Sequence, residues 1–482
     1  MKRIFTFLLP LLFLSASFRA QPANDTVIFT QLGHFYYDTV VWRAAYSPLI
    51  DRLGRPYVYT ASVDLGMVTF DINDPMNPVP VDTIRPADLN GYKATFLAQD
   101  ADTLFITTGG FQGFTQRAGL SIYDVTNPAT PVLMDHWDTA AWAHGVSHIV
   151  LDGDYAFLSA MNDGIIVLNI SDKHNIRFVS HFVPTTTPNT SYAPHTRGLY
   201  LDNDTLIDAD DGGGLRIIDA TDKQNLVQIG AYLNPVPHAT DTVYPFYNHV
   251  WCIGKHAWIP VDYAGIEVDD YSNPASITTD AWSNIWNNTG ISSWYGSDGH
   301  TNEIVYTGPT TNVLMVSGAD SQVLAFDPSD PANPRIMGWW GPPNTDNEAA
   351  WGVDEFNGLV VCGYLRDVGS NQPYYSTYGG IQLLSWNLLV TGENDNSPAT
   401  STLMISPNPT NDKATVALPA STDELFTINL IDVTGRVVQT QSADPKMNGR
   451  NAEIDMTNLA PGIYTVCVHG KTSMWTGKVV KE

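Results

Sequence analysis

The chain has 482 residues, of which only 15% are charged, and acidic residues outnumber basic ones 50 to 24, giving a formal net charge of −26. The acids are 42 Asp and 8 Glu, and because Asp favours turns whereas Glu favours helices, this composition excludes a helical bundle or coiled coil. The negative charge also excludes general binding to nucleic-acid phosphates, and a hydrophobic content of 43% is too high for a disordered chain.

The chain begins with the features of a secretory signal peptide. Met1-Lys2-Arg3 is a basic start, residues 4–14 form an apolar run, and small residues lead to Ala20. We predict that residues 1–20 are the signal peptide and that cleavage follows Ala20. No later segment approaches the ~20 apolar residues that a membrane helix needs, so no transmembrane segment is predicted.

One repeating unit organises residues 21–390. Each copy has four short apolar or alternating runs separated by turns rich in Gly, Asn, Asp and Pro, which predicts four antiparallel strands. The copies recur at intervals of roughly 45 to 60 residues, a period typical of propeller blades and solenoids. Four strands per unit favour a propeller. The seven copies begin near Tyr57, Leu104, Tyr155, Leu206, Ala257, Val313 and Leu359.

The seventh copy ends early, and the start of the mature chain supplies what it lacks. Residues 387–390 close that copy without the aromatic-ended fourth strand, whereas residues 27–35 have this pattern. Pairing the two would remove a sheet edge that otherwise invites aggregation. We therefore predict an all-β fold, a seven-bladed β-propeller closed by the N-terminal strand.

The copies resemble a known repeat. Gly164–Asp172 and Gly214–Asp222 are similar to the LVIVD repeat, which is named for its apolar strand. The resemblance covers about residues 27–390. It implies a β-propeller and says little about activity.

A histidine precedes the innermost predicted strand in four consecutive units, and an Asp follows the second strand in the same units. Both positions fall on one face of a four-stranded meander, so the side chains should gather on one rim. Two interpretations stay open: stapling, in which His bonds Asp within a blade as in WD40 propellers, and a divalent-metal site at the channel mouth. The histidines are His144, His195, His249 and His300, and the aspartates are Asp163, Asp211, Asp262 and Asp320.

A long segment between predicted strands is rich in aromatic residues. Residues 282–295 contain three Trp and one Tyr among Asn, Ser and Gly. Aromatic loop surfaces of this kind suit sugars or peptides, so a glycan or protein ligand is an interpretation of this segment.

The last part of the chain is a separate module. Residues 391–402 have the composition of a linker, and residues 403–482 predict a small β-sandwich. Its landmarks are Ser406–Thr410, Asp432–Arg436, Leu459–Tyr464 and the basic end Lys478–Lys481. They closely resemble the type A sorting domain of the type IX secretion system of Bacteroidetes. The resemblance implies passage through the periplasm, recognition by the secretion machinery, and anchoring to surface lipopolysaccharide or release.

These patterns favour a secreted or surface-anchored propeller that acts as a binding or interaction scaffold. The alternative is a metal-dependent enzyme whose site uses the four rim histidines, and a third interpretation is a structural component of the cell surface. No nucleophile elbow, phosphate loop, zincin helix or dinucleotide fingerprint supports another enzyme class.

Overall fold

The computed structural model of the chain divides into two compact units, Asn24–Thr391 and Gly392–Glu482. The predicted signal peptide and linker lie outside the described residues. No helix within the described ranges has the length and hydropathy needed to span a membrane. The described residues are 25–37, 46–109, 116–185, 194–234, 246–261, 265–283, 301–318, 322–341, 350–365, 378–389, 403, 405–418, 426–431, 437–443, 451–469 and 474–481.

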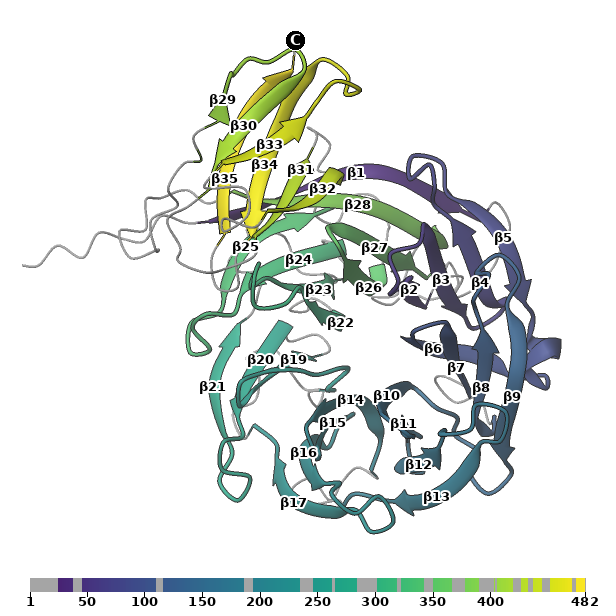
Figure 1. Cartoon of the computed structure of the whole chain (residues 1–482). Coiled ribbons are helices and arrows are strands. Elements are labelled where there is room, and N and C mark those ends of the chain that lie inside the picture. Colours follow the sequence, from purple (N-terminus) through teal and green to yellow (C-terminus); the bar gives the residue numbers. More distant parts are fainter. Residues whose placement is uncertain are drawn as a thin grey trace, which may run out of the picture. The chain divides into compact units, whose positions relative to one another are not determined.

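The described residues of the first unit form seven four-stranded antiparallel sheets, arranged around a common centre (Figure 1). One short 3-10 helix, η1 (Pro86–Leu89), precedes the second sheet. The first three sheets contain β2 (Ser47–Ile50), β3 (Tyr57–Ser62), β4 (Gly66–Asp71) and β5 (Val79–Ile84); β6 (Lys93–Asp100), β7 (Thr103–Gly109), β8 (Ala118–Asp124) and β9 (Val132–Thr139); and β10 (His148–Asp152), β11 (Tyr155–Ser159), β12 (Ile165–Asn169) and β13 (Arg177–Phe182). The next three contain β14 (Thr196–Asp202), β15 (Thr205–Asp210), β16 (Gly214–Asp219) and β17 (Val227–Tyr232); β18 (Trp251–Ile253), β19 (His256–Val261), β20 (Gly265–Asp270) and β21 (Thr278–Ser283); and β22 (Thr301–Tyr306), β23 (Leu314–Gly318), β24 (Gln322–Asp327) and β25 (Arg335–Trp340).

The remaining sheet of this unit joins the two ends of the propeller segment. Strands β26 (Ala350–Phe356), β27 (Leu359–Tyr364) and β28 (Gly380–Leu389) follow each other in sequence, and β28 then pairs antiparallel with β1 (Thr26–Tyr36). The register runs from Thr26 opposite Leu389 to Tyr36 opposite Gly380. This sheet therefore takes its outer strand from the start of the chain.

The repeated sequence pattern has a local physical cause. β12 is a run of β-branched and aliphatic residues that is buried on both faces, packed against Phe157 on one side and Ile149 on the other. It begins after Gly164, whose φ of +82° is a conformation that L side chains rarely adopt. A Cβ at Gly164 would also lie 2.3 Å from the carbonyl oxygen of Phe182. The glycine at the start of the third strand of this repeat is therefore required by the tight turn and by the adjacent fourth strand.

Much of the Asp surplus lies in turns between the third and fourth strands. In the first sheet, Asp74 accepts hydrogen bonds from the Met76 backbone N–H (3.1 Å) and the Asn77 side chain (2.7 Å). The same arrangement recurs around Asp222 and Asp330. A short carboxylate that caps nearby backbone N–H groups is a turn-forming device, so these acids are explained by repeated turns.

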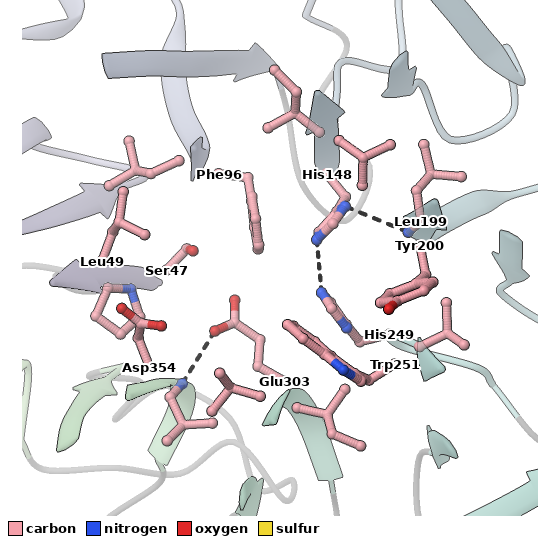
Figure 2. A pocket seen from close by; sticks show the side chains of 18 of the residues that line it. Ser47, Leu49, Phe96, His148, Leu199, Tyr200, His249, Trp251, Glu303 and Asp354 are labelled. Carbon is pink, nitrogen blue, oxygen red and sulfur yellow. Dashed lines mark hydrogen bonds between the residues drawn. The ribbon is translucent and has the colours of Figure 1, made fainter. Parts of the chain in front are cut away.

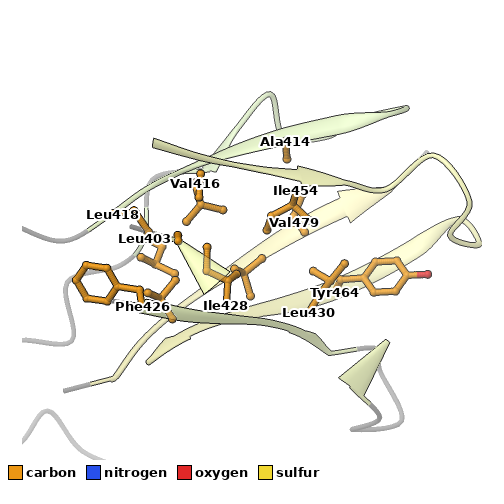
Figure 3. Packing of buried hydrophobic residues seen from close by; sticks show 14 of the residues in the cluster. Leu403, Ala414, Val416, Leu418, Phe426, Ile428, Leu430, Ile454, Tyr464 and Val479 are labelled. Carbon is orange, nitrogen blue, oxygen red and sulfur yellow. The ribbon is translucent and has the colours of Figure 1, made fainter. Parts of the chain in front are cut away.

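The C-terminal unit packs two sheets around one apolar core (Figure 3). Side chains of both sheets meet in this core, among them Val416 and Ile454 from one sheet and Ile428, Val466 and Val479 from the other. The unit therefore has the hydrophobic centre that an independently folding module needs. The first sheet contains β29 (Ile405–Ser406), β30 (Lys413–Ala417) and β33 (Asn451–Asp455), and the second contains β32 (Val437–Ala443), β31 (Phe426–Ile431), β34 (Gly462–His469) and β35 (Met474–Lys481).

Candidate functional site: a cavity among the innermost strands

A cavity of about 460 Å³ lies among the first strands of the seven sheets (Figure 2). Its wall is mainly aliphatic, with a few polar side chains that converge on it, which is the usual character of a small-molecule site. Every innermost strand, or the residues just before it, contributes. The lining residues are Ser47, Pro48, Leu49, Arg52, Phe96, Leu97, His148, Ile149, Val150, Leu151, Leu199, Tyr200, Leu201, His249, Val250, Trp251, Glu303, Ile304, Val305, Val353 and Asp354.

Residues of different size lie near the start of the inner strands. His148 begins β10 and pairs with Ser159, and Gly352 lies near the start of β26 and pairs with Gly363. A Cβ at Gly352 would lie 2.3 Å from Cδ of Pro48 and 3.0 Å from Oε2 of Glu303, so a larger residue at this position would displace the carboxylate. Small residues on some strands thus leave room for large polar ones on others.

Two histidines form a direct pair in the wall. Nε2 of His148 lies 2.7 Å from Nε2 of His249, and Nδ1 of His148 accepts the Leu199 backbone N–H at 3.4 Å. His148 therefore carries its proton on Nε2 and donates it to His249. Burial lowers the pKa of His249 to about 4, helped by the Arg197 charge, and burial together with the neighbouring imidazole lowers the pKa of His148 well below its usual value. Both rings are therefore neutral at physiological pH.

Glu303 is a nearly buried acid that lines the cavity together with this pair. Its Oε2 accepts the Val353 backbone N–H at 3.1 Å. Burial raises the pKa of Glu303 well above its ordinary value; the Val353 N–H and Ser47 oppose this rise, and the Asp354 carboxylate adds to it. Burial therefore favours the neutral form of this carboxyl.

Asp354 joins the last sheet to the first. Its Oδ2 accepts the Ile50 backbone N–H at 2.8 Å, and its Oδ1 lies 2.7 Å from the Arg52 guanidinium. The Asp354 side chain is only 6% exposed, whereas that of Arg52 is 31% exposed. A nearly buried carboxylate with two strong partners on another sheet fixes β2 against β26.

The histidine–glutamate layer separates this cavity from a smaller space. Phe96, His148, His249 and Glu303 also line a space of about 20 Å³. The rest of the wall of that space is more polar and comes from the residues that precede the inner strands or begin them: Tyr46, Ser147, Arg197, Asn248, Asn302 and Trp351. The layer therefore divides an apolar compartment from a polar one.

The rim histidines do not all behave alike. Nδ1 of His144 lies 2.9 Å from Asp163, and Nδ1 of His195 lies 3.5 Å from Asp211, which also lies 3.6 Å from Arg197. Burial lowers the pKa of His195 to about 4, and the Arg197 and His144 charges act in the same direction. His249 instead contacts His148. These distances are of the kind that stapling requires, while stapling itself stays a prediction.

The predicted metal site remains untested. His300, Asp262 and Asp320 lie outside the described residues, as does most of the aromatic segment 282–295. In the part of the chain that the structure describes, no group of three or more His, Cys, Asp or Glu side chains is placed to hold a metal ion.

Sequence reasoning missed His148 and Glu303, although each left a signal. The predicted rim set took His144, the histidine that lies just before the inner strand of its unit, whereas His148 begins that strand, β10, and lines the cavity. Glu303 is one of only eight Glu residues in the chain and begins an otherwise apolar stretch of an inner strand. A rare acid in an apolar strand is a signal that sequence analysis can use.

Two landmarks of the C-terminal module meet in space. The Asn408 side chain donates to the Lys478 carbonyl at 2.8 Å and accepts the Val480 backbone N–H at 2.9 Å. Thr410 also forms a β-bridge with Lys481. The Pro-Asn-Pro segment and the basic end are thus parts of one structural feature.

Replacing His249 with Gln should make the protein less sensitive to acid. The His249 imidazole has a pKa of about 4 when folded, against ~6.5 when unfolded. The unfolded chain therefore binds the extra proton between these values, and the free energy of unfolding falls as pH is lowered through this range, by at most about 1.4 kcal/mol per pH unit for one group. Gln cannot titrate but still accepts the His148 proton. Urea unfolding at neutral and mildly acidic pH should show a smaller acid-induced loss in His249→Gln than in the wild type.

The control for this experiment is His34→Gln, because His34 is exposed. Its acid-induced loss should match that of the wild type. If His249→Gln also matched the wild type, His249 would not be held neutral by the fold.

The sheets and the cavity at their centre define the first unit as a β-propeller-like repeat protein. Comparison with protein families then locates two modules in the chain: LVIVD repeats at residues 115–139 and 145–182, and a secretion system C-terminal sorting domain at residues 404–482. Both resemblances stated from the sequence are thereby confirmed. The sorting domain indicates export by the type IX system to the cell surface or beyond it.

Comparison with solved structures gives matches of low sequence identity. A chain of the mitotic checkpoint complex is 8% identical with a TM-score of 0.50, and the match covers 80% of this chain and 98% of that one. The β-propeller domain of Cps50 from Myceliophteria thermophila is 12% identical with a TM-score of 0.46, covering 74% and 98%. PorZ of Porphyromonas gingivalis, a surface component of the type IX secretion system, is 12% identical with a TM-score of 0.35, covering 89% and 64%. No curated protein shows a significant sequence match.

Proposed function

We propose that this chain is an exported seven-bladed β-propeller that binds a small molecule in the cavity at its centre. The observation that carries the proposal is the cavity itself, which has an apolar wall and a few converging polar groups. The sorting domain takes this binding unit to the cell surface or the medium, after a signal peptide at residues 1–20 has taken it to the periplasm.

Closure of the ring is part of this proposal. It is supported by the pairing of β1 with β28 and by the position of β2, which contacts both β6 and β26. The bonds of Asp354 to Ile50 and Arg52 lie at this junction. A closed ring holds the inner strands at fixed separations, so the cavity keeps its shape without a ligand and binding loses less free energy to ordering.

Filling the cavity should abolish ligand binding. Native mass spectrometry of the secreted protein should detect a small molecule that is retained by the wild type and lost in Val150→Phe, because Val150 lines the cavity wall. If no molecule is retained, a panel of small fragments can be screened by thermal shift. Val150→Phe should then bind the fragments that bind the wild type with an affinity lower by roughly tenfold or more.

The matched control is Val132→Phe, in which the same change is made at a side chain that is 61% exposed on an outer strand. It should bind as the wild type does. Binding that is absent from all three proteins, or unchanged in Val150→Phe, would contradict the proposed function.

A further inference from the structure

Among the ionisable groups of the cavity wall, some are paired with each other and one acid is not. Arg52 and Asp354 neutralise each other at 2.7 Å, and the two histidines are a neutral hydrogen-bonded pair. Glu303 is the remaining ionisable acid of the wall, and it forms no ion pair with any described residue. Glu303 is therefore the group whose charge a ligand can complement.

Two charged side chains act on Glu303 in opposite directions. The Asp354 carboxylate, on the neighbouring strand β26, raises the pKa of Glu303, and the Arg197 guanidinium from β14 lowers it. Arg197 lies 3.6 Å from Asp211, which offsets its charge. With the chain carrying a formal charge of −26, cations are also drawn toward the protein from solution.

Aromatic faces line the same space as the carboxyl. Phe96, Tyr200 and Trp251 belong to the cavity wall, and Figure 2 shows the Glu303 carboxyl pointing toward Phe96, with Trp251 beside the Glu303 side chain. The rings of Tyr200 and Trp251 lie 5.5 Å apart between centroids. Aromatic faces attract ammonium groups through the ring quadrupole, more strongly where water is excluded. A carboxylate beside such faces is the arrangement that recognises organic cations.

We propose that the cavity takes an organic cation, with its ammonium group between Glu303 and the faces of Phe96 and Trp251 and its apolar body along the aliphatic wall. This inference rests on the proposed function and adds the chemical class of the ligand. Of the possible ligands, only a cation gains an ion pair with the Glu303 carboxylate, because Arg52 and Asp354 are already paired with each other.

Binding of the cation is coupled to a proton. The raised pKa of Glu303 favours the protonated form of its carboxyl when no cation is bound. An ammonium group favours the carboxylate, so the Glu303 proton leaves to solvent as the ion pair forms. The groups that face this carboxyl are Asp354, Arg197, Tyr46 and the neutral histidines, none of which pairs with it as a cation. Affinity for a permanently charged cation should therefore rise with pH until Glu303 is ionised in the free protein.

Three small molecules that share a substituted benzene ring and differ in charge test the proposal on the full secreted chain. They are para-(trimethylammonio)benzyl alcohol, its neutral isostere para-tert-butylbenzyl alcohol, and the anion para-tert-butylbenzoate. Isothermal titration calorimetry should rank the cation first, and Glu303→Gln should weaken the cation by roughly tenfold or more while changing the neutral probe by less than roughly twofold. Glu355→Gln is the control, because Glu355 lies on β26 outside the cavity wall.

Proton release provides a test that does not depend on a variant. The calorimetric heat for the cation should differ between buffers of different ionisation enthalpy, and the heat for the neutral probe should not. Equal binding of cation and neutral probe, unaffected by Glu303→Gln, would overturn the cation inference and leave the proposed cavity function standing. If none of the three probes and no fragment bound, both the cation inference and the proposed function would be contradicted.

Discussion

Removal of residues 404–482 is expected to abolish the appearance of this protein on the cell surface and in the medium. The sorting domain has its own apolar core, and the propeller unit buries a separate one. The truncated propeller should therefore still fold and accumulate inside the cell. Fractionation and protease accessibility in a bacterium with a working type IX system would measure this, with most of the wild type outside and nearly all of the truncated chain inside.

A single substitution in the sorting domain tests the same export signal without removing the domain. Asn408→Ala removes the hydrogen bonds that join the Pro-Asn-Pro segment to Lys478 and Val480, and should lower export without changing the propeller. Asn451→Ala, at an exposed position of the same unit, is the control and should be exported normally. Surface exposure of the truncated protein would show that residues 404–482 are not the export signal.

Asp354→Ala should cause the largest loss of stability among the cavity substitutions. It leaves the Ile50 backbone N–H and the Arg52 guanidinium without their carboxylate at the junction of β2 and β26. Leaving the buried Ile50 N–H without its acceptor costs about 1–3 kcal/mol, and loss of the partly exposed Arg52 pair adds up to about 1 kcal/mol, which together are a large part of the stability of most domains. Urea unfolding followed by tryptophan fluorescence would measure the change in the free energy of unfolding.

Asp64→Ala is the matched control for this effect. Asp64 also forms an ion pair between sheets, with Lys93 at 3.2 Å, but its side chain is 35% exposed. Solvent screening limits such a pair to about 1 kcal/mol or less. Similar small losses in both variants would mean that the Asp354 bonds do not hold the first and last sheets together.

The sequence predicted the strands well because their causes are local. The apolar run of β12, the glycine that precedes it and the Asp-Pro or Asp-Asn turns each act within a few residues. A repeat multiplies these local signals, so the positions of the sheets could be read from a single chain. The sorting domain was equally readable, since its landmarks lie in short segments.

The cavity was less readable because it depends on residues about fifty or more positions apart. His148 and His249 meet through strands of two different sheets, and their side chains contact across 101 positions of sequence. No local pattern marks a pair of this kind. The predicted rim histidines were those that precede an inner strand, and among the described ones only His249 lines the cavity.

The sequence by itself determined the class of structure and the cellular destination of this protein. The class of structure follows from short-range rules, namely strand periodicity and turn chemistry, and the destination follows from the resemblance of the last module to a known sorting domain. The tertiary structure decided which side chains face the centre, because only the stacking of sheets brings Glu303, His249 and Phe96 together and excludes water from them. That exclusion changes an ordinary acid into a buried carboxyl with a raised pKa, and a property that arises from burial cannot be read from residue order alone.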